Sequence, residues 1–402
     1  MIENSQKSSA LVSSFQRAQD AVPSRAVVQG LDFLSDLLGK ADIQINGSRP
    51  WDIRIHDLRT VQRVLAHGSL GLGESYMNGW WDCDRLDEFF TRVLREKLDE
   101  KVARSALVWQ SLRARFVNLQ SGRRAYEVGE VHYDLGNDFF ASMLDRRLTY
   151  TCGYWNRATD LDEAQVAKLD MVCRKLGLKP GMRLLDIGCG WGSLMKYAAQ
   201  TYGVTCVGLT ISREQAAFGN DNASAVGLPI EFRLADYRAF NVDGKEKFDC
   251  VASIGMFEHV GSKNYDAYFS VARRSLKDDG LFLLHTIGKN QRRGGVDPWI
   301  NKYIFPNGEL PDLGAISDAS QREFIIEDVH NFGADYDRTL MAWHARFEHA
   351  WPKFTDRYGP RFYRMWRYYL LACAGTFRAR ATQLWQIVLS PSGVENGYRR
   401  VS

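Results

Sequence analysis

The sequence predicts an α/β fold with a mostly parallel sheet, together with a smaller and mainly helical N-terminal domain. From His132 onward, apolar runs of strand length alternate with helical stretches. Near-continuous apolar strands of this kind are typical of parallel sheets that are buried on both faces. Before about residue 120, apolar residues recur mainly at helical spacing. The length of 402 residues fits two domains at roughly 100–200 residues each.

Composition and charge indicate an ordinary globular chain in a reducing compartment. Hydrophobic residues make up 45% of the sequence and charged residues 25%, and the net charge of +4 is too small by itself to indicate a nucleic-acid partner. No apolar run approaches the roughly 18 residues of a membrane-spanning helix, and the N-terminus lacks the apolar region of a signal peptide. The seven cysteines are scattered without CxxC spacing. This argues against a metal site or a disulfide framework and favours the cytoplasm.

The N-terminal third divides into short elements. In chain order we expect a polar, weakly ordered lead (1–24), a small domain (25–120), a linker (121–131) and a larger domain (132–402). Within the small domain we predict a helix ending at Gly39, short strands at 43–45 and 53–55, a helix from Asp57 to Gly68, a glycine-rich loop over 68–82, and a further helix from Asp84.

The segment 92–124 is rich in basic residues, and two interpretations stay open. It can be a solvated helix face followed by a linker. It can also be a cationic, partly apolar face that rests on anionic lipid headgroups. The sequence does not separate the two.

Five apolar runs in the larger domain predict the buried parallel strands of βαβ units. They are MRLLDIG (182–188), VTCVGLT (204–210), IEFRLAD (230–236), FDCVASIG (248–255) and GLFLLHTIG (280–288). The carboxyl ends of such strands are where α/β sheets bind ligands. Functional residues are therefore expected at or just after these runs.

The strongest local signal is LLDIGCGWGSL (184–194), in which a strand is followed by Gly188, Gly190 and Gly192 and then by a helix. Glycines let the backbone approach a ligand closely, and a helix start favours negative charge. Such a turn alone could serve a nicotinamide cofactor. The GxGxG spacing, with Asp186 before the first glycine, instead resembles motif I of the S-adenosylmethionine-dependent methyltransferases.

The next two strand ends supply polar groups for the rest of a nucleoside. A protein that binds a nicotinamide cofactor usually has a carboxylate at the second strand end. Here Thr210 stands at that position, and Ser212 and Gln215, which can hydrogen-bond a ribose, follow it. The third strand delivers Asp236 and Tyr237, suited to an adenine amino group and ring face. Thr210 and Ser212 could also be a plain helix cap. Together with the glycine turn, the cofactor interpretation is preferred.

Motifs along nearly the whole chain resemble the cyclopropane-fatty-acyl-phospholipid synthases, a family within the S-adenosylmethionine-dependent methyltransferase superfamily. They are HYDLGNDFF (132–140), YTCGYW (150–155), LDIGCGWGSL (185–194), GLTIS (208–212), GMFEHVG (255–261), LLHTIG (283–288), DPWINKYIFPNGELP (297–311), HNFGADYD (330–337) and ACAGTFRAR (372–380), with INGSRPWDIRIHD (45–57) and GSLGLGESYMNGWWDCDRLDEFF (68–90) in the small domain.

The resemblance implies a Rossmann-like class I methyltransferase domain, and a reaction. The methyl group of S-adenosylmethionine is transferred to a cis double bond of a phospholipid acyl chain, a carbocation forms, and loss of a proton to enzyme-bound bicarbonate closes a cyclopropane ring, with S-adenosylhomocysteine as by-product. It also implies a homodimer and peripheral contact with the inner face of the membrane. A plain alkene offers no proton to remove beforehand, so the chain must position the donor in a dry cavity and place a base near the methyl carbon.

The resemblance also implies the site residues. Bicarbonate would be held by Glu258, His285 and Tyr336, with backbone groups of Cys152 and Ile287; Cys373 belongs to the implied catalytic set, although direct methyl transfer requires no thiol nucleophile. The cofactor set comprises Tyr150, Thr151, Asp186, Gly188, Gly190, Trp191, Gly192, Thr210, Ile211, Ser212, Gln215, Asp236 and Tyr237. Tyr150 is the best-placed aromatic for stabilising a cation. Glu258 and His285 are expected to follow the fourth and fifth strand-like runs.

Three alternatives remain beside this interpretation. Glu258 and His285 could form a hydrogen bond within an ordinary buried polar network. The enzyme could carry out another S-adenosylmethionine-dependent alkyl transfer, such as methylation or methylenation of the acyl chain. A lipid-binding or scaffolding protein that has lost catalysis is a third possibility, but it would be expected to lack Glu258, His285 or Tyr336, and all three are present.

Overall fold

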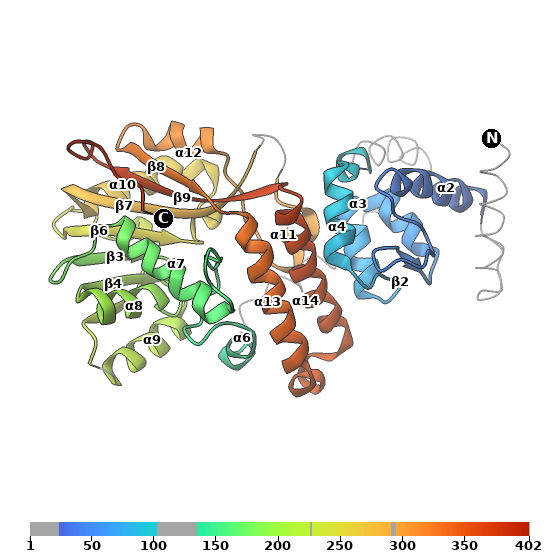
Figure 1. The fold of residues 1–402 in the computed structure, drawn as a ribbon, viewed down its shortest axis with the longest axis horizontal. Helices are drawn as coiled ribbons and strands as arrows, with labels where there is room; N and C mark the ends of the chain where they lie inside the picture. Colours follow the sequence, from blue (N-terminus) through green and yellow to red (C-terminus); the bar gives the residue numbers. More distant parts are fainter. Residues whose placement is uncertain (1–23, 103–134, 226, 291–294, 402) are drawn as a thin grey trace. The chain divides into compact units, whose positions relative to one another are not determined.

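A computed structural model describes residues 24–102, 135–225, 227–290 and 295–401 (Figure 1). It divides into two compact units, and each is discontinuous in sequence. Unit 1 comprises Met1–Leu135, Asp297–Pro306 and Glu348–Ala381, and unit 2 comprises Gly136–Val296, Asn307–Phe347 and Thr382–Ser402. Two segments from the C-terminal half thus belong to the N-terminal unit. The predicted lead and linker lie outside the described residues, apart from Ser24, and the domain boundaries given above stay predictions.

Unit 1 is mainly helical. Its elements are α2 (Arg25–Gly39), β1 (Arg54–Ile55), α3 (Arg59–Met77), β2 (Trp81–Asp82), α4 (Leu86–Arg95), α11 (Pro298–Tyr303), a short 3-10 turn (Trp351–Lys353) and α14 (Thr355–Arg378). The helix end at Gly39 and the helix after Asp84 are confirmed. The strand predicted at 43–45 is wrong, because only an isolated bridge joins Ile45 to Ile53, and β1 pairs with β2 instead.

The glycine-rich stretch 68–82 is not the predicted loop. Helix α3 continues through it to Met77, with one break at Gly68, where φ is +56°. A Cβ atom at Gly71 would overlap the carbonyl oxygen of Arg63, and one at Gly73 would overlap the ring of Trp299. These glycines therefore allow close packing between helical segments, which composition alone does not distinguish from a turn.

Unit 2 is an α/β unit. Its elements are α6 (Asn137–Met143), α7 (Leu161–Lys175), β3 (Arg183–Ile187), α8 (Ser193–Tyr202), β4 (Thr205–Thr210), α9 (Arg213–Ala225), β5 (Ile230–Leu234), η1 (Tyr237–Ala239), β6 (Phe248–Ile254), η2 (Phe257–His259), η3 (Ser262–Asn264), α10 (Tyr265–Ser275), β7 (Leu276–Lys289), α12 (Leu313–Ser320), β8 (Ile325–Asn331), α13 (Ala334–Ala350, unit 2 as far as Phe347) and β9 (Thr382–Ser390).

The seven-stranded sheet has the order β5-β4-β3-β6-β7-β9-β8. All five predicted strands are present and pair in parallel, which confirms the mostly parallel sheet. Strand β9 runs antiparallel to both β7 and β8. Neither β8 nor β9 is among the strands predicted from sequence.

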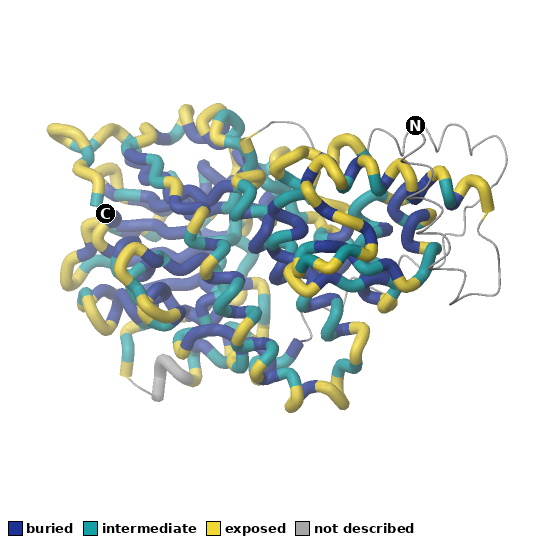
Figure 2. Tube along the Cα trace, turned by 45° about the vertical axis from the view of Figure 1, so that its right-hand side comes forward, coloured by how far each residue is buried: buried dark blue, intermediate teal, exposed yellow. Residues whose placement is uncertain are grey.

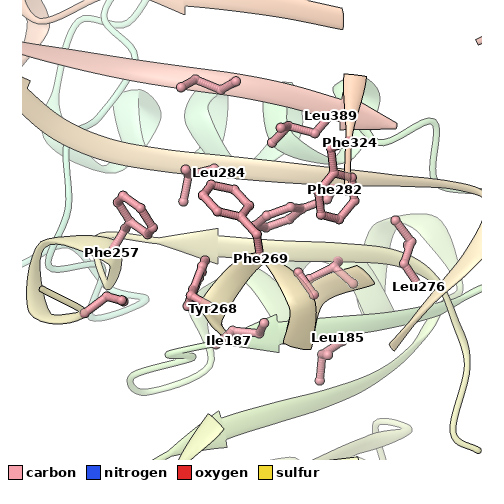
Figure 3. Close-up of a cluster of buried hydrophobic side chains, with 14 of the residues drawn as sticks. Leu185, Ile187, Phe257, Tyr268, Phe269, Leu276, Phe282, Leu284, Phe324 and Leu389 are labelled. Atoms are coloured by element: carbon pink, nitrogen blue, oxygen red, sulfur yellow. The ribbon is translucent and has the colours of Figure 1, made fainter. Parts of the chain in front are cut away.

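Two apolar layers cover the two faces of this sheet. On one face, Leu185 and Phe282 pack with residues of α10 and α12, and Figure 3 shows part of this cluster. On the other face, Leu184 and Cys250 pack with residues of α7, α8 and α9. The five inner strands are accordingly buried along most of their length, whereas the edge strands β5 and β8 are largely half-buried or exposed (Figure 2). A sheet covered on both faces leaves the ends of its strands as the place for polar function.

The surface interpretation of 92–124 is not tested, because most of that segment lies outside the described residues. Among the helices that the structure describes, none is both long and apolar enough to cross a membrane.

Candidate active site

The glycine turn after β3 lies at a helix start, with Gly188 and Gly190 half-buried and Gly192 buried. Gly188, Gly190 and Gly192 all have positive φ, of 86°, 54° and 79°, a conformation that side chains disfavour. A Cβ atom at Gly188 would come within 2.6 Å of Met256, whereas one at Gly190 would meet nothing within 4 Å. Helix α8 begins directly after Gly192. The turn can thus take a ligand against its backbone at Gly190, as predicted for the amino acid part of the cofactor.

Asp186, inside β3, is buried, and burial raises its pKa to about 7 while the charge of Lys168 opposes that rise. Lys168 on α7 is also buried, and desolvation lowers its pKa to about 8. Its Nζ donates a hydrogen bond to Oγ1 of Thr151 at 2.9 Å. Gln165, one helical turn earlier, donates to the Thr151 carbonyl at 2.7 Å. One face of α7 therefore holds the segment that carries Tyr150, Thr151 and Cys152.

Two aromatic residues of the predicted cofactor set lie close together. The rings of Tyr150 and Trp191 each pack against Phe140, with centroids 5.3 Å away in both cases. The indole nitrogen of Trp191 donates to Oδ1 of Asn137 at 3.0 Å. Asn137 and Phe140 of the HYDLGNDFF motif thereby contact Trp191 of the glycine turn.

At the end of β4, the predicted ribose-binding groups hydrogen-bond to one another. Oγ1 of Thr210 donates to the side-chain oxygen of Gln215 at 2.9 Å and accepts from the backbone N–H of Ser212 at 3.1 Å. Oγ of Ser212 accepts from the N–H of Gln215 at 3.2 Å. This is the arrangement of a helix cap, the alternative interpretation of Thr210 and Ser212. Ile211 is 76% exposed.

At the end of β5, the Asp236 carboxylate pairs with Arg238, two residues on, at 2.5 Å. Tyr237 packs edge-on against Tyr268 at 5.3 Å. The structure thus gives Asp236 a local ion-pair partner. The assignment of both residues to adenine stays a prediction.

Glu258 lies in the turn after β6 and is 7% exposed. Its Oε1 accepts a hydrogen bond from the backbone N–H of Ile287 at 2.6 Å, while its buried Oε2 has no hydrogen-bond partner among the described residues. Burial raises the pKa of Glu258 to about 7, and the Ile287 N–H and, to a smaller extent, the Thr286 side chain oppose that rise. The side chain can therefore carry or release a proton near neutral pH. The Ile287 N–H, whose residue was predicted to contact bicarbonate through its backbone, is instead hydrogen-bonded to Glu258.

His285 lies within β7 rather than after it, so its predicted position needs correction. The ring is 1% exposed, and Nδ1 lies 3.2 Å from Nε2 of Gln386 on β9. Nε2 of His285 is buried without a partner among the described residues. Burial, together with the charges of Lys168 and Lys175, holds the pKa of His285 well below its usual range. The imidazole is therefore neutral.

Strand pairing brings these groups into one region. The N–H of Gly255, three residues before Glu258, donates to the carbonyl of His285 at 2.9 Å. A Cβ atom at Gly255 would come within 2.7 Å of Thr151, so the 150–153 segment lies directly against the end of β6. Two polar atoms without partners among the described residues thus lie on neighbouring elements, one on Glu258 after β6 and one on His285 within β7.

Helix α13, whose first turn carries Tyr336, is hydrogen-bonded to the same segment through Thr339. Oγ1 of Thr339 accepts hydrogen bonds from the N–H of Gly153 at 3.1 Å and from the indole of Trp155 at 2.9 Å. Tyr336 is buried, and its ring centroid lies 6.1 Å from that of Trp343, which is 5.2 Å from that of Tyr150. Cys152 is fully buried, and burial raises the pKa of its thiol well above the usual value.

Cys373 and His259 differ from this group. Cys373 lies on α14 and belongs to unit 1, whereas the other candidates belong to unit 2. Burial and the charge of Asp297 raise its pKa to about 12, so it is a neutral thiol at pH 7. His259 is exposed although its neighbour Glu258 is buried, as expected for successive residues that point apart.

Four residues that contact the candidate site were not predicted from the sequence: Lys168, Gln386, Thr339 and Trp343. None of them stands in a glycine turn or beside a strand-end acid. A lysine among the apolar residues of α7 was the one available signal, because a buried ammonium requires partners.

Comparison with known proteins identifies the family. A family model described as mycolic acid cyclopropane synthetase matches residues 120–387. The chain belongs to this family. It is 56% identical over 368 residues to the cyclopropane-fatty-acyl-phospholipid synthase of Escherichia coli (strain K12), covering 91% of this chain and 94% of that protein. Membership confirms the resemblance drawn from the motifs and makes the chain an S-adenosylmethionine-dependent enzyme of the cyclopropane synthetase family.

Solved structures agree with this membership. The mycolic acid cyclopropane synthase CmaA1, crystallised with S-adenosylhomocysteine and CTAB, is 36% identical, with a TM-score of 0.59 over 64% of this chain and 95% of that chain. Coclaurine N-methyltransferase, at 22% identity and a TM-score of 0.64, covers 79% of this chain and 98% of its own, and it supports the fold alone. The predicted class I methyltransferase fold of the larger domain is confirmed.

Proposed function

We propose that the chain converts the cis double bond of an unsaturated phospholipid acyl chain into a cyclopropane ring, with S-adenosylmethionine as donor of the added carbon and S-adenosylhomocysteine as by-product. The 56% identity to the E. coli phospholipid synthase supports this substrate class. The observation that carries the chemistry is a pair of buried atoms, Oε2 of Glu258 and Nε2 of His285, that have no hydrogen-bond partner in the described part of the chain. They fit a small molecule that donates one hydrogen bond, to Oε2 of Glu258, and accepts another, from Nε2 of His285.

Bicarbonate has that composition, because it offers one hydroxyl and two further acceptor oxygens. Glu258 would accept the hydroxyl proton through Oε2, and neutral His285 would donate from Nε2 to an oxygen. Tyr336 and the backbone of Cys152 would complete the set. Bound there, bicarbonate would supply the base that removes the proton after methyl transfer. Because Ile287 already holds Oε1 of Glu258, the free oxygen is fixed in direction.

The remaining residues would orient the donor and keep the site dry. The backbone at Gly190 would face the amino acid part of the cofactor, and Tyr150 would present a ring to positive charge, worth roughly 0.5–2 kcal/mol. Exclusion of water matters because a carbocation would otherwise be trapped. Membrane contact from the cytoplasmic side and a homodimer belong to the same proposal and rest on the resemblance alone.

The test is an assay of the purified chain with S-adenosylmethionine and vesicles of a cis-monounsaturated phospholipid, with bicarbonate removed or added. Mass spectrometry should show a product heavier by one CH₂ without the double bond, in a bicarbonate-dependent manner. We expect Glu258→Gln to lose about 100-fold or more in kcat, within the range for a positioned acid–base group. Glu323→Gln, at a carboxylate bonded to the Ser270 hydroxyl, is the matched control.

The outcomes separate the alternatives. A methylated product that is saturated at the site, or a methylenated product, would assign a different alkyl transfer to the same site. Full activity without bicarbonate would remove the proposed base. An unchanged lipid in the presence of bound cofactor would mean that the acceptor is another molecule.

A further inference from the structure

A buried glutamine contacts the imidazole of the proposed site. Gln386 on β9 lies directly opposite His285 on β7 in the antiparallel register, and its amide Nε2 is 3.2 Å from Nδ1 of His285. The two residues are 0% and 1% exposed. Opposed residues of an antiparallel pair place their side chains on the same face. The strand register itself therefore sets the amide against the ring.

The chemistry of this contact determines where the ring proton resides. An amide nitrogen donates and does not accept, so Nδ1 of the neutral ring must be the acceptor. The single ring proton is then on Nε2. That nitrogen is buried with no acceptor among the described residues, and a buried donor of this kind requires a partner. An anionic oxygen beside His285 would satisfy it.

The opposite orientation of the amide has a different consequence. With Oε1 of Gln386 against Nδ1, the ring proton would reside on Nδ1, and Nε2 would present a lone pair that repels an anion. Oε1 has no hydrogen-bond partner among the residues that the structure describes. The two orientations therefore predict opposite tautomers, and a measurement can separate them.

We propose that Gln386 is a positioning residue: by donating to Nδ1, it holds His285 in the tautomer that carries its proton on Nε2, ready to donate to the anion. The inference rests on the proposed function for the identity of the anion. The contact and the tautomer do not depend on it.

The experiment is ¹⁵N NMR of the full-length chain labelled at histidine, with the resonances of His285 among the eight histidines assigned from a His285→Gln variant. We expect the wild type to show the proton on Nε2. In Gln386→Leu, the His285 ring should lose its preference for the tautomer with the proton on Nε2. In Gln386→Glu, the ionised carboxylate can only accept a hydrogen bond, so the ring proton should move toward Nδ1. Gln383→Leu is the matched control: Gln383 is a buried β9 glutamine opposite Gly288, and it accepts from Asn331 at 3.0 Å.

Activity gives the second readout. Gln386→Leu should lower kcat by about 10- to 100-fold, the size usual for losing a group that orients a functional histidine, with KM for S-adenosylmethionine and the melting temperature matching Gln383→Leu. A wild-type proton on Nδ1, or a tautomer and kcat unchanged in Gln386→Leu, would overturn the proposal. If ¹³C-bicarbonate leaves the His285 resonances of the wild type unmoved while the tautomer is as expected, the identity of the anion fails and the role of Gln386 stands.

Discussion

At the scale of single residues, Glu258 illustrates how a site residue can reduce stability. Its carboxyl is buried, one of its oxygens has no hydrogen-bond partner among the residues that the structure describes, and burial raises its pKa from 4.5 to about 7. The folded state therefore keeps a proton that the unfolded state releases between these two values. The free energy of unfolding consequently falls as pH rises through that window, and the full penalty is present above pH 7.

We therefore predict that Glu258→Gln is more stable than the wild type at pH 8, by roughly 2–3 kcal/mol, and that the two converge near pH 4. Denaturant unfolding of both proteins across this range checks the prediction. Comparing the pair cancels the opposite pH dependence that the lowered pKa values of His285 and His330 add to each protein. A stability difference that does not vary with pH would show that Glu258 is not the group that titrates.

Candidate residues could be named from the sequence only where a motif contains them, and their roles stay predictions. Glu258 and the three glycines stand in recognisable motifs, and the structure places Glu258 after β6 and His285 within the neighbouring strand β7. Lys168 and Gln386 act through neighbours more than 15 residues away in sequence, Thr151 and His285 respectively. Their partners are determined by helix packing and strand register, and a single sequence does not reveal either.

At the scale of elements, the parallel strands were predictable because their burial on both faces makes them almost continuously apolar. Strand β8 (IIEDVHN) lacks that signal, with much of it partly or fully exposed. Strand β9 carries two glutamines within an apolar run. The prediction of a loop after Gly68 was wrong for a different reason. Gly71 and Gly73 serve packing between helical segments, and only Gly79, after the end of α3, lies in a turn.

The packing role of these glycines leads to a prediction for Gly71→Ala. A methyl group there would overlap the Arg63 carbonyl, which is backbone and cannot rotate away, so the helical segments must separate. We expect a loss of about 1–3 kcal/mol, as for overpacked cores. Gly39→Ala, at the end of α2 with nothing within 4 Å of its Cβ position, should change stability little.

Thermal unfolding of the two variants beside the wild type is sufficient to test this. Equal melting temperatures for Gly71→Ala and the wild type would mean that the two parts of α3 are not held together as closely as the structure shows.

At the scale of the whole molecule, the first boundary between the units, after Leu135, lies close to the change in sequence pattern, but the units divide again later in the chain. The shift to alternating strands and helices at about residue 132 suggests a cut there, yet Asp297–Pro306 and Glu348–Ala381 belong to unit 1. Within that unit, Arg378 on α14 pairs with the buried Asp87 at 2.6 Å. The ring of Tyr368, also on α14, packs against Phe90 at 5.2 Å. The spacing of apolar residues predicts that a helix has an apolar face, but it does not identify the element that packs against that face.

A fragment of residues 136–402 is therefore expected to be defective although it contains all of unit 2. It would retain α14 but lose α3 and α4, leaving Tyr368 and Arg378 without these partners and exposing a helix face that is buried in unit 1. Exposed apolar surface of that kind promotes aggregation, so most of the fragment should sediment or bind a hydrophobic dye. Co-expression of residues 1–135 should restore a soluble complex, because that piece supplies Asp87 and Phe90. A monodisperse fragment that unfolds as cooperatively as the full chain would instead locate the structural boundary near residue 132, with α14 stable without its unit 1 partners.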